Sequence, residues 1–347
     1  MQGFEKSINS MWLAYSLTAT ECDAFKLLNS FAKGNTHWSE MTKIQNEPSI
    51  DEAMSLLDAH PDFKVIRRIS PRTAFADSDG RALSKGVVVD TETTGTNPDK
   101  DAIIELGMVL FEFDPETGIA YNALESFDQL EDPGFPIPPE SIEVHGITDE
   151  MVAGKRIEET RVEQFLDGVS LVVAHNSKFD RVFLEKRLLI FETLPWGCSI
   201  AQVEWNAEGI GSAKLDYIAY QYGLFYDAHR AEVDCFALLE ILQKPLPKSG
   251  ELVLKSILNS LGQKSYTVYA TGSPFETKDT LKARSYRWDA DKKCWHTTIT
   301  GDDAIKAEIA WLKSNVYSGK PAKVEIEVQN CLTRFSNRVG NRAIREI

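Results

Sequence analysis

The sequence feature that most constrains the fold is the run Gly-Val-Val-Val-Asp at residues 86–90 of the 347-residue chain. Consecutive β-branched residues favour an extended strand, and an unbroken apolar run is typical of a strand that is buried on both faces. An acidic residue is costly beside such a strand unless it has a partner or a task. The run therefore predicts a central strand of an α/β sheet that ends in a carboxylate.

The segments that follow predict a mixed α/β domain over residues 85–244. Strands that come first as a meander and then alternate with helices indicate a mixed sheet flanked by helices. The expected elements after the first strand are two strands, an extended proline segment, a helix-strand-turn-helix unit and two helices, at residues 101–114, 119–130, 134–140, 163–189, 214–225 and 229–243.

Regions of different character flank this domain. Residues 1–84 predict a helical N-terminal region and a linker, with Ser49 and Asp51 as start signals of one helix and a short strand at residues 62–69. In residues 245–347 the expected elements follow the order β-α-β-β-α-β. That order is compatible with a small ferredoxin-like α+β domain.

The formal net charge of −14 is unevenly distributed. Residues 245–347 carry 17 Lys and Arg against 11 Asp and Glu, a net charge of +6, so the rest of the chain carries −20. A basic domain suits phosphate contact, and an acidic body suits divalent cations, although uneven surface charge without a function explains the numbers equally well.

Basic and aromatic residues alternate within the basic third. This pattern suits phosphate contact combined with stacking on bases, but Tyr286, Trp288 and Trp295 could instead form the core of a small sheet. The candidate nucleic-acid contacts are Lys282, Arg284, Arg287, Trp288, Lys292 and Lys293.

Several classes of protein are disfavoured by what the sequence lacks. The five cysteines are scattered and contain no Cys-x-x-Cys pair, so neither a zinc knuckle nor a disulfide framework is expected. No apolar run reaches the length of a membrane span, and the first residues do not resemble a secretory signal. A cytoplasmic protein that makes no membrane contact is therefore expected.

Four acidic residues and one histidine occupy places that the fold would bring together. Asp90 and Glu92 are two apart on an extended chain, so their carboxylates share one face. Asp180 opens a helix after a strand, and Asp234 lies on a helix five residues after His229. Each alone is as well explained as a cap or a solvated group, but their joint order within one domain indicates a site.

The chemistry of such a site follows from its charge. The ends of strands in an open α/β sheet meet at one edge, where sites usually form. Four carboxylates would repel one another there unless cations lay between them. Oxygen-rich clusters suit Mg²⁺ or Mn²⁺ rather than zinc. The sequence therefore predicts a divalent-metal site.

The motifs resemble those of the DEDDh exonucleases, the DnaQ-like family of the epsilon proofreading subunit of bacterial DNA polymerase III. VVVDTETTG at residues 87–95 is similar to the first family motif, and HGIT at 145–148 to the short motif after it. AHNSKFD at 174–180 and HRAEVD at 229–234 are similar to the second and third motifs. The resemblance covers about residues 85–243 and implies an RNase H-like fold.

The resemblance also implies roles for individual residues in hydrolysis from a 3′ end with release of 5′-mononucleotides. Asp90 would bridge two Mg²⁺ or Mn²⁺ ions, Glu92 and Asp234 would complete one site, and Asp180 would support the other. His229 would act as general base toward the attacking water. The substrate-binding residues implied by the motifs are Thr93, Thr94, Gly95, His145, Asn176 and Phe179.

The preferred interpretation is a freestanding exonuclease that acts on DNA 3′ ends in repair or replication. An exoribonuclease of the same family is the main alternative, since no motif reports a 2′-hydroxyl contact. A non-catalytic binding protein is disfavoured because no metal ligand of the pattern is missing. A third alternative is a polymerase-bound subunit, with residues 333–347 as a possible polymerase-binding tail.

The QYGLF segment at 221–225 resembles a sliding-clamp tag, but Leu224 and Phe225 are expected in the core.

Overall fold

The computed structural model describes residues 49–77 and 80–347, and the chain divides into two compact units, Met1–Val65 and Ile66–Ile347. The described part of the first unit contains helix α2 (Ile50–Asp58). Ser49 Oγ accepts the Glu52 N–H and the Glu52 carboxylate accepts the Ser49 N–H, which confirms the predicted helix start. The rest of the predicted helical region lies in residues 1–48, outside the described residues.

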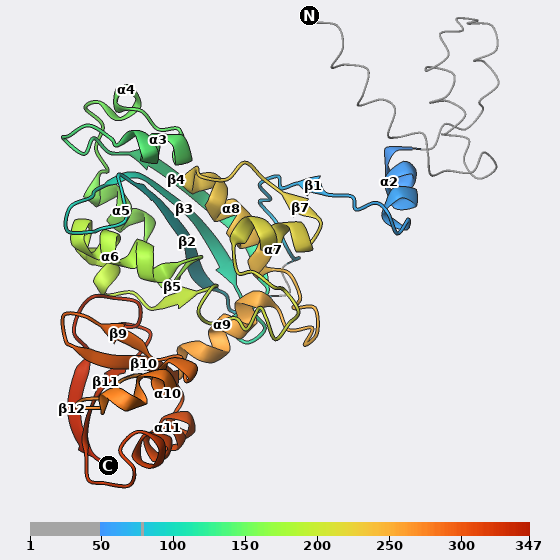
Figure 1. Ribbon diagram of the computed structural model, residues 1–347. Helices are drawn as coiled ribbons and strands as arrows, with labels where there is room; N and C mark the ends of the chain where they lie inside the picture. Colours follow the sequence, from blue (N-terminus) through green and yellow to red (C-terminus); the bar gives the residue numbers. More distant parts are fainter. Residues whose placement is uncertain (1–48, 78–79) are drawn as a thin grey trace, which may run out of the picture. The chain divides into compact units, whose positions relative to one another are not determined.

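The second unit is built on a five-stranded mixed sheet in the order β4-β3-β2-β5-β6 (Figure 1). The pairs β4–β3 and β3–β2 are antiparallel, whereas β2–β5 and β5–β6 are parallel. This is the RNase H-like arrangement, and it confirms the predicted mixed sheet. The strands are β2 (Ser84–Thr93), β3 (Ile103–Phe113), β4 (Ala120–Leu130), β5 (Val169–Ala174) and β6 (Trp196–Cys198).

Strand β2 lies at the centre of this sheet because its valines fill cores on both faces. Val88 packs in one apolar cluster, and Val87 and Val89 pack in the cluster on the opposite face, all with no solvent exposure. Successive side chains of a strand point to opposite faces, so a run of three valines needs two cores. The strand continues to Thr93 and therefore includes both Asp90 and Glu92, rather than ending at Asp90 as predicted.

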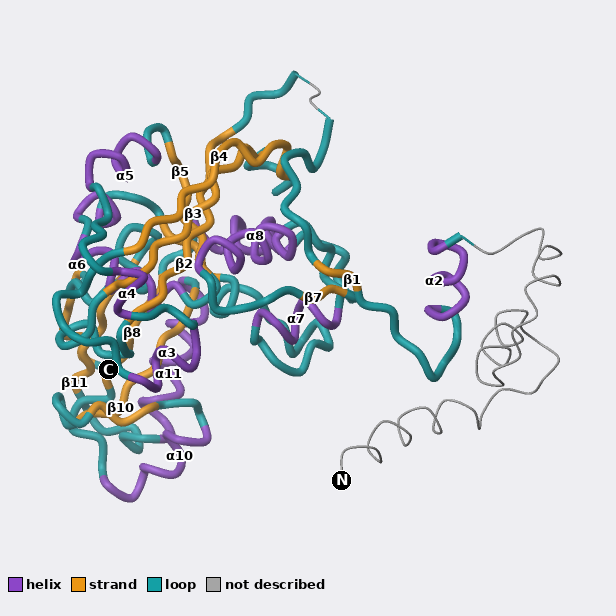
Figure 2. The backbone as a smooth tube through the Cα atoms, turned by 90° about the horizontal axis from the view of Figure 1, so that it is seen from above, coloured by secondary structure: helices purple, strands orange, loops and turns teal. Residues whose placement is uncertain are grey.

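Helices cover both faces of the sheet (Figure 2). Helices α7, α8 and α9 contribute to the core on the Val88 face, and α5 and α6 contribute to the other core. Helix α8 lies directly on β3, because a Cβ atom added at Gly107 would be 2.3 Å from the Ala231 carbonyl carbon. The helices are α3 (Pro139–His145), α4 (Asp149–Val152), α5 (Glu159–Phe165), α6 (Ser177–Arg187), the 3₁₀ turn η3 (Leu189–Glu192), α7 (Leu215–Gln221), α8 (Ala231–Leu242) and α9 (Val253–Leu261).

One predicted helix is too long. The segment 214–225 forms α7 only as far as Gln221, because Gly223 adopts a left-handed φ of 71° that ends the helix. Strand β7 (Leu224–Phe225) follows and pairs in parallel with β1 (Arg67–Arg68). Of the strand predicted at 62–69, only these two residues form one. Of the two residues expected in the core, Leu224 is partly buried and packs against the core on the α8 side, whereas the partly buried Phe225 ring packs under the Arg68 guanidinium.

The C-terminal part forms a second five-stranded sheet in the order β12-β11-β8-β10-β9, antiparallel throughout. Its first four strands in sequence have the neighbour order of a ferredoxin-like unit, as predicted. Strand β12 was not predicted and extends the edge beside β11. The elements are β8 (Ser265–Tyr269), the 3₁₀ turn η4 (Phe275–Thr277), α10 (Lys278–Ala283), β9 (Arg287–Asp289), β10 (Cys294–Thr300), α11 (Asp302–Asn315), β11 (Lys323–Gln329) and β12 (Asn341–Glu346).

The two sheets are joined by the segment at residues 330–338. The side chain of Arg181 on α6 is fully buried and donates hydrogen bonds to the carbonyl oxygens of Leu332 and Arg334 at 2.5 and 2.8 Å. Glu185, one turn further along α6, accepts from Arg181 at 2.6 Å and from Arg338 at 3.0 Å. The segment that could have been a free polymerase-binding tail is thus folded against α6 and continues into β12.

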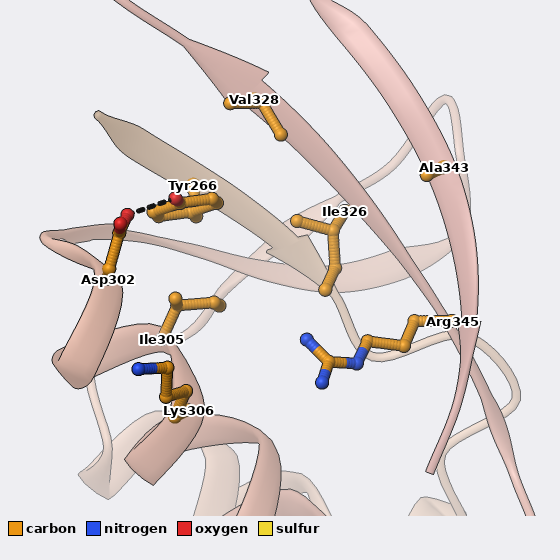
Figure 3. A pocket seen from close by; sticks show the side chains of 8 residues that line it. All are labelled: Tyr266, Asp302, Ile305, Lys306, Ile326, Val328, Ala343 and Arg345. Carbon is orange, nitrogen blue, oxygen red and sulfur yellow. Dashed lines mark hydrogen bonds between the residues drawn. The ribbon is translucent and has the colours of Figure 1, made fainter.

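A pocket of about 330 Å³ lies between the second sheet and α11 (Figure 3). Its floor is apolar, and the side chains of Lys306 and Arg345 border it, while the Tyr266 hydroxyl hydrogen-bonds to Asp302. None of the four acids singled out in the sequence lines this pocket. Among the described residues, no helix is long and apolar enough to cross a membrane.

Candidate active site

Three of the predicted acids meet where β2 passes the first turn of α8. Asp90 and Glu92 alternate along β2, and Asp234 lies in the first turn of α8. One carboxylate oxygen from each lies within 4.8 Å of the other two. The helix can come this close because Gly107, the β3 residue paired with Asp90, has no side chain between the sheet and α8.

The fourth acid, Asp180, reaches the same region from the other side of β2. It lies in the first turn of α6, directly after β5, and its side chain is buried. Its Oδ1 atom accepts hydrogen bonds from the Thr91 N–H at 3.1 Å and the Thr91 hydroxyl at 2.9 Å. Thr91, which the sequence did not single out, thus fixes Asp180 against the strand between Asp90 and Glu92.

The electrostatics of this acidic cluster favour a bound cation. Burial, and then the charges of Asp180 and Asp234, raise the pKa of Asp90 well above its usual range. Burial and the neighbouring carboxylates also raise the pKa of Glu92 to about 8, and burial raises that of Asp180 to about 7. A donor set made only of carboxylate oxygens fits Mg²⁺ or Mn²⁺, whose charge would remove this penalty.

These shifts predict how the stability of the metal-free protein depends on pH. Between pH 6.5 and 8 the folded protein holds protons on Asp180 and Glu92 that the unfolded chain has lost, so the free energy of unfolding should fall as pH rises. Each such proton contributes a slope of at most about 1.4 kcal/mol per pH unit. Urea unfolding in EDTA measures it.

The histidines oppose this decline, mostly toward the lower end of the pH window. Burial lowers the pKa of His175 to about 4, so this residue gives stability that rises with pH below its unfolded value. The Glu92→Gln variant is the control and should flatten the decline between pH 6.5 and 8. A wild-type stability that is constant or rises over this window in EDTA would contradict the assignment of the shifts.

The predicted base, His229, lies in the loop before α8 and not on the helix itself. Its side chain is exposed, and its backbone has a left-handed φ of 70°, which histidine tolerates better than most residues. Its N–H donates to Asp234 Oδ2 at 2.8 Å, and the Tyr226 hydroxyl donates to Asp234 Oδ1 at 3.1 Å. Asp234 therefore shapes the loop that presents the imidazole beside the acidic cluster.

An ion pair that was not predicted from the sequence holds the same loop. Glu105 on β3 is fully buried and accepts from Arg230 Nη2 at 2.6 Å and from the Ala231 N–H at 2.9 Å. Glu105 also lies opposite Glu92 in the strand pairing. A glutamate within the apolar stretch of residues 103–111 was the available signal, since a buried charge needs a partner.

The residues predicted from the first motif to bind substrate form a tight turn at the end of β2. The Thr93 hydroxyl donates to the Gly95 carbonyl at 2.6 Å, and the Thr94 hydroxyl accepts the Ala102 N–H at 3.0 Å. A side chain at Gly95 would meet the Asp101 carboxylate at 2.5 Å. In this structure both hydroxyls shape the turn.

The three other predicted substrate residues differ in what they present. His145 ends α3, is buried, and accepts the Ile147 N–H at its Nδ1 atom, whereas its Nε2 atom has no partner. Burial lowers the pKa of His145, so a neutral ring with its hydrogen on Nε2 is expected. Asn176 is exposed at the start of α6, and the partly buried Phe179 ring lies 5.1 Å from that of Phe183.

The six candidate contacts in the C-terminal part do not form one surface. Arg284 pairs with the buried Glu308 at 3.0 Å, and the Tyr286 hydroxyl donates to the same glutamate. Tyr286 is buried and Trp295 packs in the core, as the structural alternative expected, whereas Trp288 is 52% exposed. The remaining candidates, all exposed, are Lys282, Arg287, Lys292 and Lys293.

Comparison with known proteins places these features in a family. A family model described as "Exonuclease" matches residues 87–242. The chain is 34% identical over 162 residues to a DNA polymerase III subunit epsilon of Treponema pallidum, covering 44% of this chain and 72% of the relative. It is also 34% identical over 147 residues to a PolC-type DNA polymerase III of Thermotoga maritima, covering 42% of this chain but 10% of that relative.

Solved structures of exonucleases are also similar to part of the chain. Exonuclease X in complex with 5′ overhanging duplex DNA is 24% identical, with 50% of this chain and 91% of that chain covered and a TM-score of 0.36. The nuclease domain of 3′hExo, a DEDDh family member bound to rAMP, is 21% identical, with 51% and 97% covered and a TM-score of 0.39.

The epsilon relative is matched over 72% of its length. The region matched by the family model, residues 87–242, contains α6, α8 and β2 from Val87 onward, with all four acids and His229 in motif order. The chain belongs to the DEDDh, DnaQ-like family of 3′–5′ exonucleases.

Proposed function

We propose that this protein is a divalent-metal-dependent exonuclease that removes nucleotides from the 3′ end of DNA and releases 5′-mononucleotides, in DNA repair or replication. The observation that carries the proposal is the convergence of Asp90, Glu92 and Asp234 oxygens within 4.8 Å, beside an exposed histidine. Carboxylates with raised pKa values in such a cluster indicate a site built for cations rather than for stability.

The acidic cluster supplies the metal ligands in this proposal. Asp90, Glu92 and Asp234 would hold one ion, and Asp90 with Asp180 would hold the second. When bound, the two ions stabilise the attacking and leaving oxygens of a phosphodiester. Thr91 keeps Asp180 in place through two hydrogen bonds, and Tyr226 orients Asp234.

His229 is proposed as the general base that accepts a proton from the attacking water. Its imidazole is exposed to solvent at the cluster, and the loop behind it is fixed by two backbone hydrogen bonds to Asp234, from His229 at 2.8 Å and from Arg230 at 3.2 Å. The Glu105–Arg230 ion pair anchors this loop to β3. A rigid loop keeps the imidazole close to the reacting water without further ordering.

The 3′-terminal nucleotide is proposed to lie between the first-motif turn and the start of α6. The Nε2 hydrogen of His145 finds no partner among the described residues, and an acceptor on the substrate would satisfy it. Asn176 can hydrogen-bond to sugar or phosphate, and the face of Phe179 can contact the sugar or base. Thr93, Thr94 and Gly95 would contribute the backbone of the turn.

The test is degradation of matched single-stranded DNA, duplex DNA and RNA that carry a 5′ label. With Mg²⁺, single-stranded or duplex DNA should give a ladder of shorter labelled fragments, and EDTA should abolish it. Blocking the 3′ terminus should prevent the ladder, since hydrolysis begins there. Internal cleavage, hydrolysis that persists in EDTA, or exclusive degradation of RNA would contradict the proposal, and the last result would support the exoribonuclease alternative.

A further inference from the structure

The C-terminal sheet is attached to the helix that carries Asp180. The segment at residues 330–338 contacts Arg181 and also β6. Its Cys331 carbonyl accepts a hydrogen bond from the backbone N–H of Trp196 at 2.9 Å. Arg334 reaches back to the Ser260 and Gln263 carbonyls near the end of α9. The side chains of this sheet are therefore held in a fixed relation to the first turn of α6.

Strand alternation divides the basic and aromatic residues at 282–295 between the two faces of this sheet. Trp288 pairs with Trp295 on the face that carries α10 and α11, where their rings are 5.5 Å apart. Arg287 pairs with His296, and neighbours on a strand point to opposite faces, so both lie on the face without helices. We call this the open face.

The cations close to His296 differ in their partners from those beside α10 and α11, although Arg342, also on the open face, pairs with Glu325 and Glu327. On the helix-covered side, Lys282 pairs with Asp279 at 3.9 Å and Arg284 with Glu308 at 3.0 Å. In the described part of the chain, Arg287, Lys292 and Lys178 make no ion pair within 4.0 Å. Asp289, on the same face, offsets part of the positive charge of Lys292 and His296, but no ion pair among the described residues closes these cations to an external anion.

These three cations lie near enough to His296 to influence its pKa. The pKa of His296 is lowered, first by burial, while Asp289 opposes the shift and Lys178, Lys292 and Arg287 add to it. Lys178 comes from the first turn of α6, two residues before Asp180, whereas the other two belong to the C-terminal sheet. The Lys292 ammonium donates to the Tyr269 hydroxyl at 2.7 Å, and the His296 and Tyr269 rings are 5.7 Å apart.

We propose that Lys178, Arg287, Lys292 and His296, named here the His296 cluster, bind the backbone phosphates of the single strand whose 3′ end occupies the carboxylate site. The inference rests on the proposed function. Residues 1–244 carry a net charge of −20 and repel a polyanion, so a cationic cluster beside the start of α6 sets the direction in which the strand leaves the site. Contacts to phosphate oxygens do not depend on base sequence.

The test is the salt dependence of binding to a 20-nucleotide single-stranded DNA in Ca²⁺, measured by fluorescence anisotropy. Arg287→Gln should raise Kd several-fold and lower the slope of log Kd against log salt by about 0.7 for each phosphate that the variant no longer neutralises. Lys292→Gln and Lys178→Gln provide independent variants. Lys313→Gln, which removes an exposed cation from α11, is the matched control and should change neither quantity.

The outcomes separate this inference from the proposed function. The His296 cluster would be overturned as a phosphate site if the salt slope stayed at the wild-type value in all three variants, Arg287→Gln, Lys292→Gln and Lys178→Gln. Weaker binding by Trp288→Ala, with wild-type binding by these variants, would also overturn it, because the strand would then follow the other face. Absence of Mg²⁺-dependent hydrolysis of a thymidine 5′-phosphate nitrophenyl ester by the wild type would instead contradict the proposed function.

Discussion

Replacing Asp90 by asparagine should lower kcat for hydrolysis of single-stranded DNA by at least about a thousand-fold, because several kcal/mol of transition-state charge stabilisation depend on the metal site. The same substitution should raise the melting temperature of the metal-free protein. Asp90 is surrounded by Asp180, Asp234, Glu92 and Glu105, all of which raise its pKa, so in the metal-free protein it costs free energy either to keep a buried charge at Asp90 or to bind a proton there. Neutral asparagine removes this cost.

Steady-state kinetics in Mg²⁺ and thermal unfolding in EDTA measure the two effects. Glu112→Gln is a suitable control, because Glu112 lies on the neighbouring strand β3 and hydrogen-bonds to Asn122, away from the cluster. It should leave kcat unchanged. If Asp90→Asn kept more than a few per cent of wild-type kcat, the carboxylate site would not be where hydrolysis takes place.

Replacing His229 by asparagine should lower kcat by about a hundred-fold to ten-thousand-fold, the usual contribution of a general base. Asparagine is chosen because it also tolerates the φ of 70° at this position, and because the hydrogen bond to Asp234 comes from the backbone. The affinity for DNA should therefore stay close to that of the wild type, and the pH dependence of kcat should change.

Single-turnover kinetics and anisotropy separate the two quantities for this variant. His60→Asn, which changes a half-buried histidine just after α2, provides the control and should have no effect on either. Wild-type turnover in His229→Asn would show that another group accepts the proton. A large decrease in affinity with unchanged kcat would assign His229 to substrate binding.

The parts of the fold that depend on local sequence could be predicted. Three successive valines required a strand buried on both faces, and the spacing of Asp90 and Glu92 placed two carboxylates on one side of it. Asp180 could be located because it opens a helix directly after a strand, and Asp234 because it lies in the first turn of a helix. Local sequence could not show that β2 extends past Asp90 and Glu92 to Thr93, because this extension depends on the pairing with β3.

The features that were missed depend on residues far apart in the chain. The partner of Glu105 is Arg230, 125 residues later, and nothing in either local segment identifies the other. Strand β7, which follows the helix end at Gly223, forms by pairing with β1, far earlier in the chain. The proposed domain boundary near residue 244 depends on contacts of the same kind, since α9 beyond it packs into the core of the central sheet.

The double attachment of the C-terminal sheet has a mechanical consequence. The chain enters this sheet from α9 and returns to α6 and β6 through residues 330–338, where Phe335 packs into the core beneath α6. A module held at a single linker can swing about it, whereas one held at two separated points has no free pivot. The sheet cannot act as a swinging arm, and a strand that it holds must advance by sliding over a stationary guide as the 3′ end shortens.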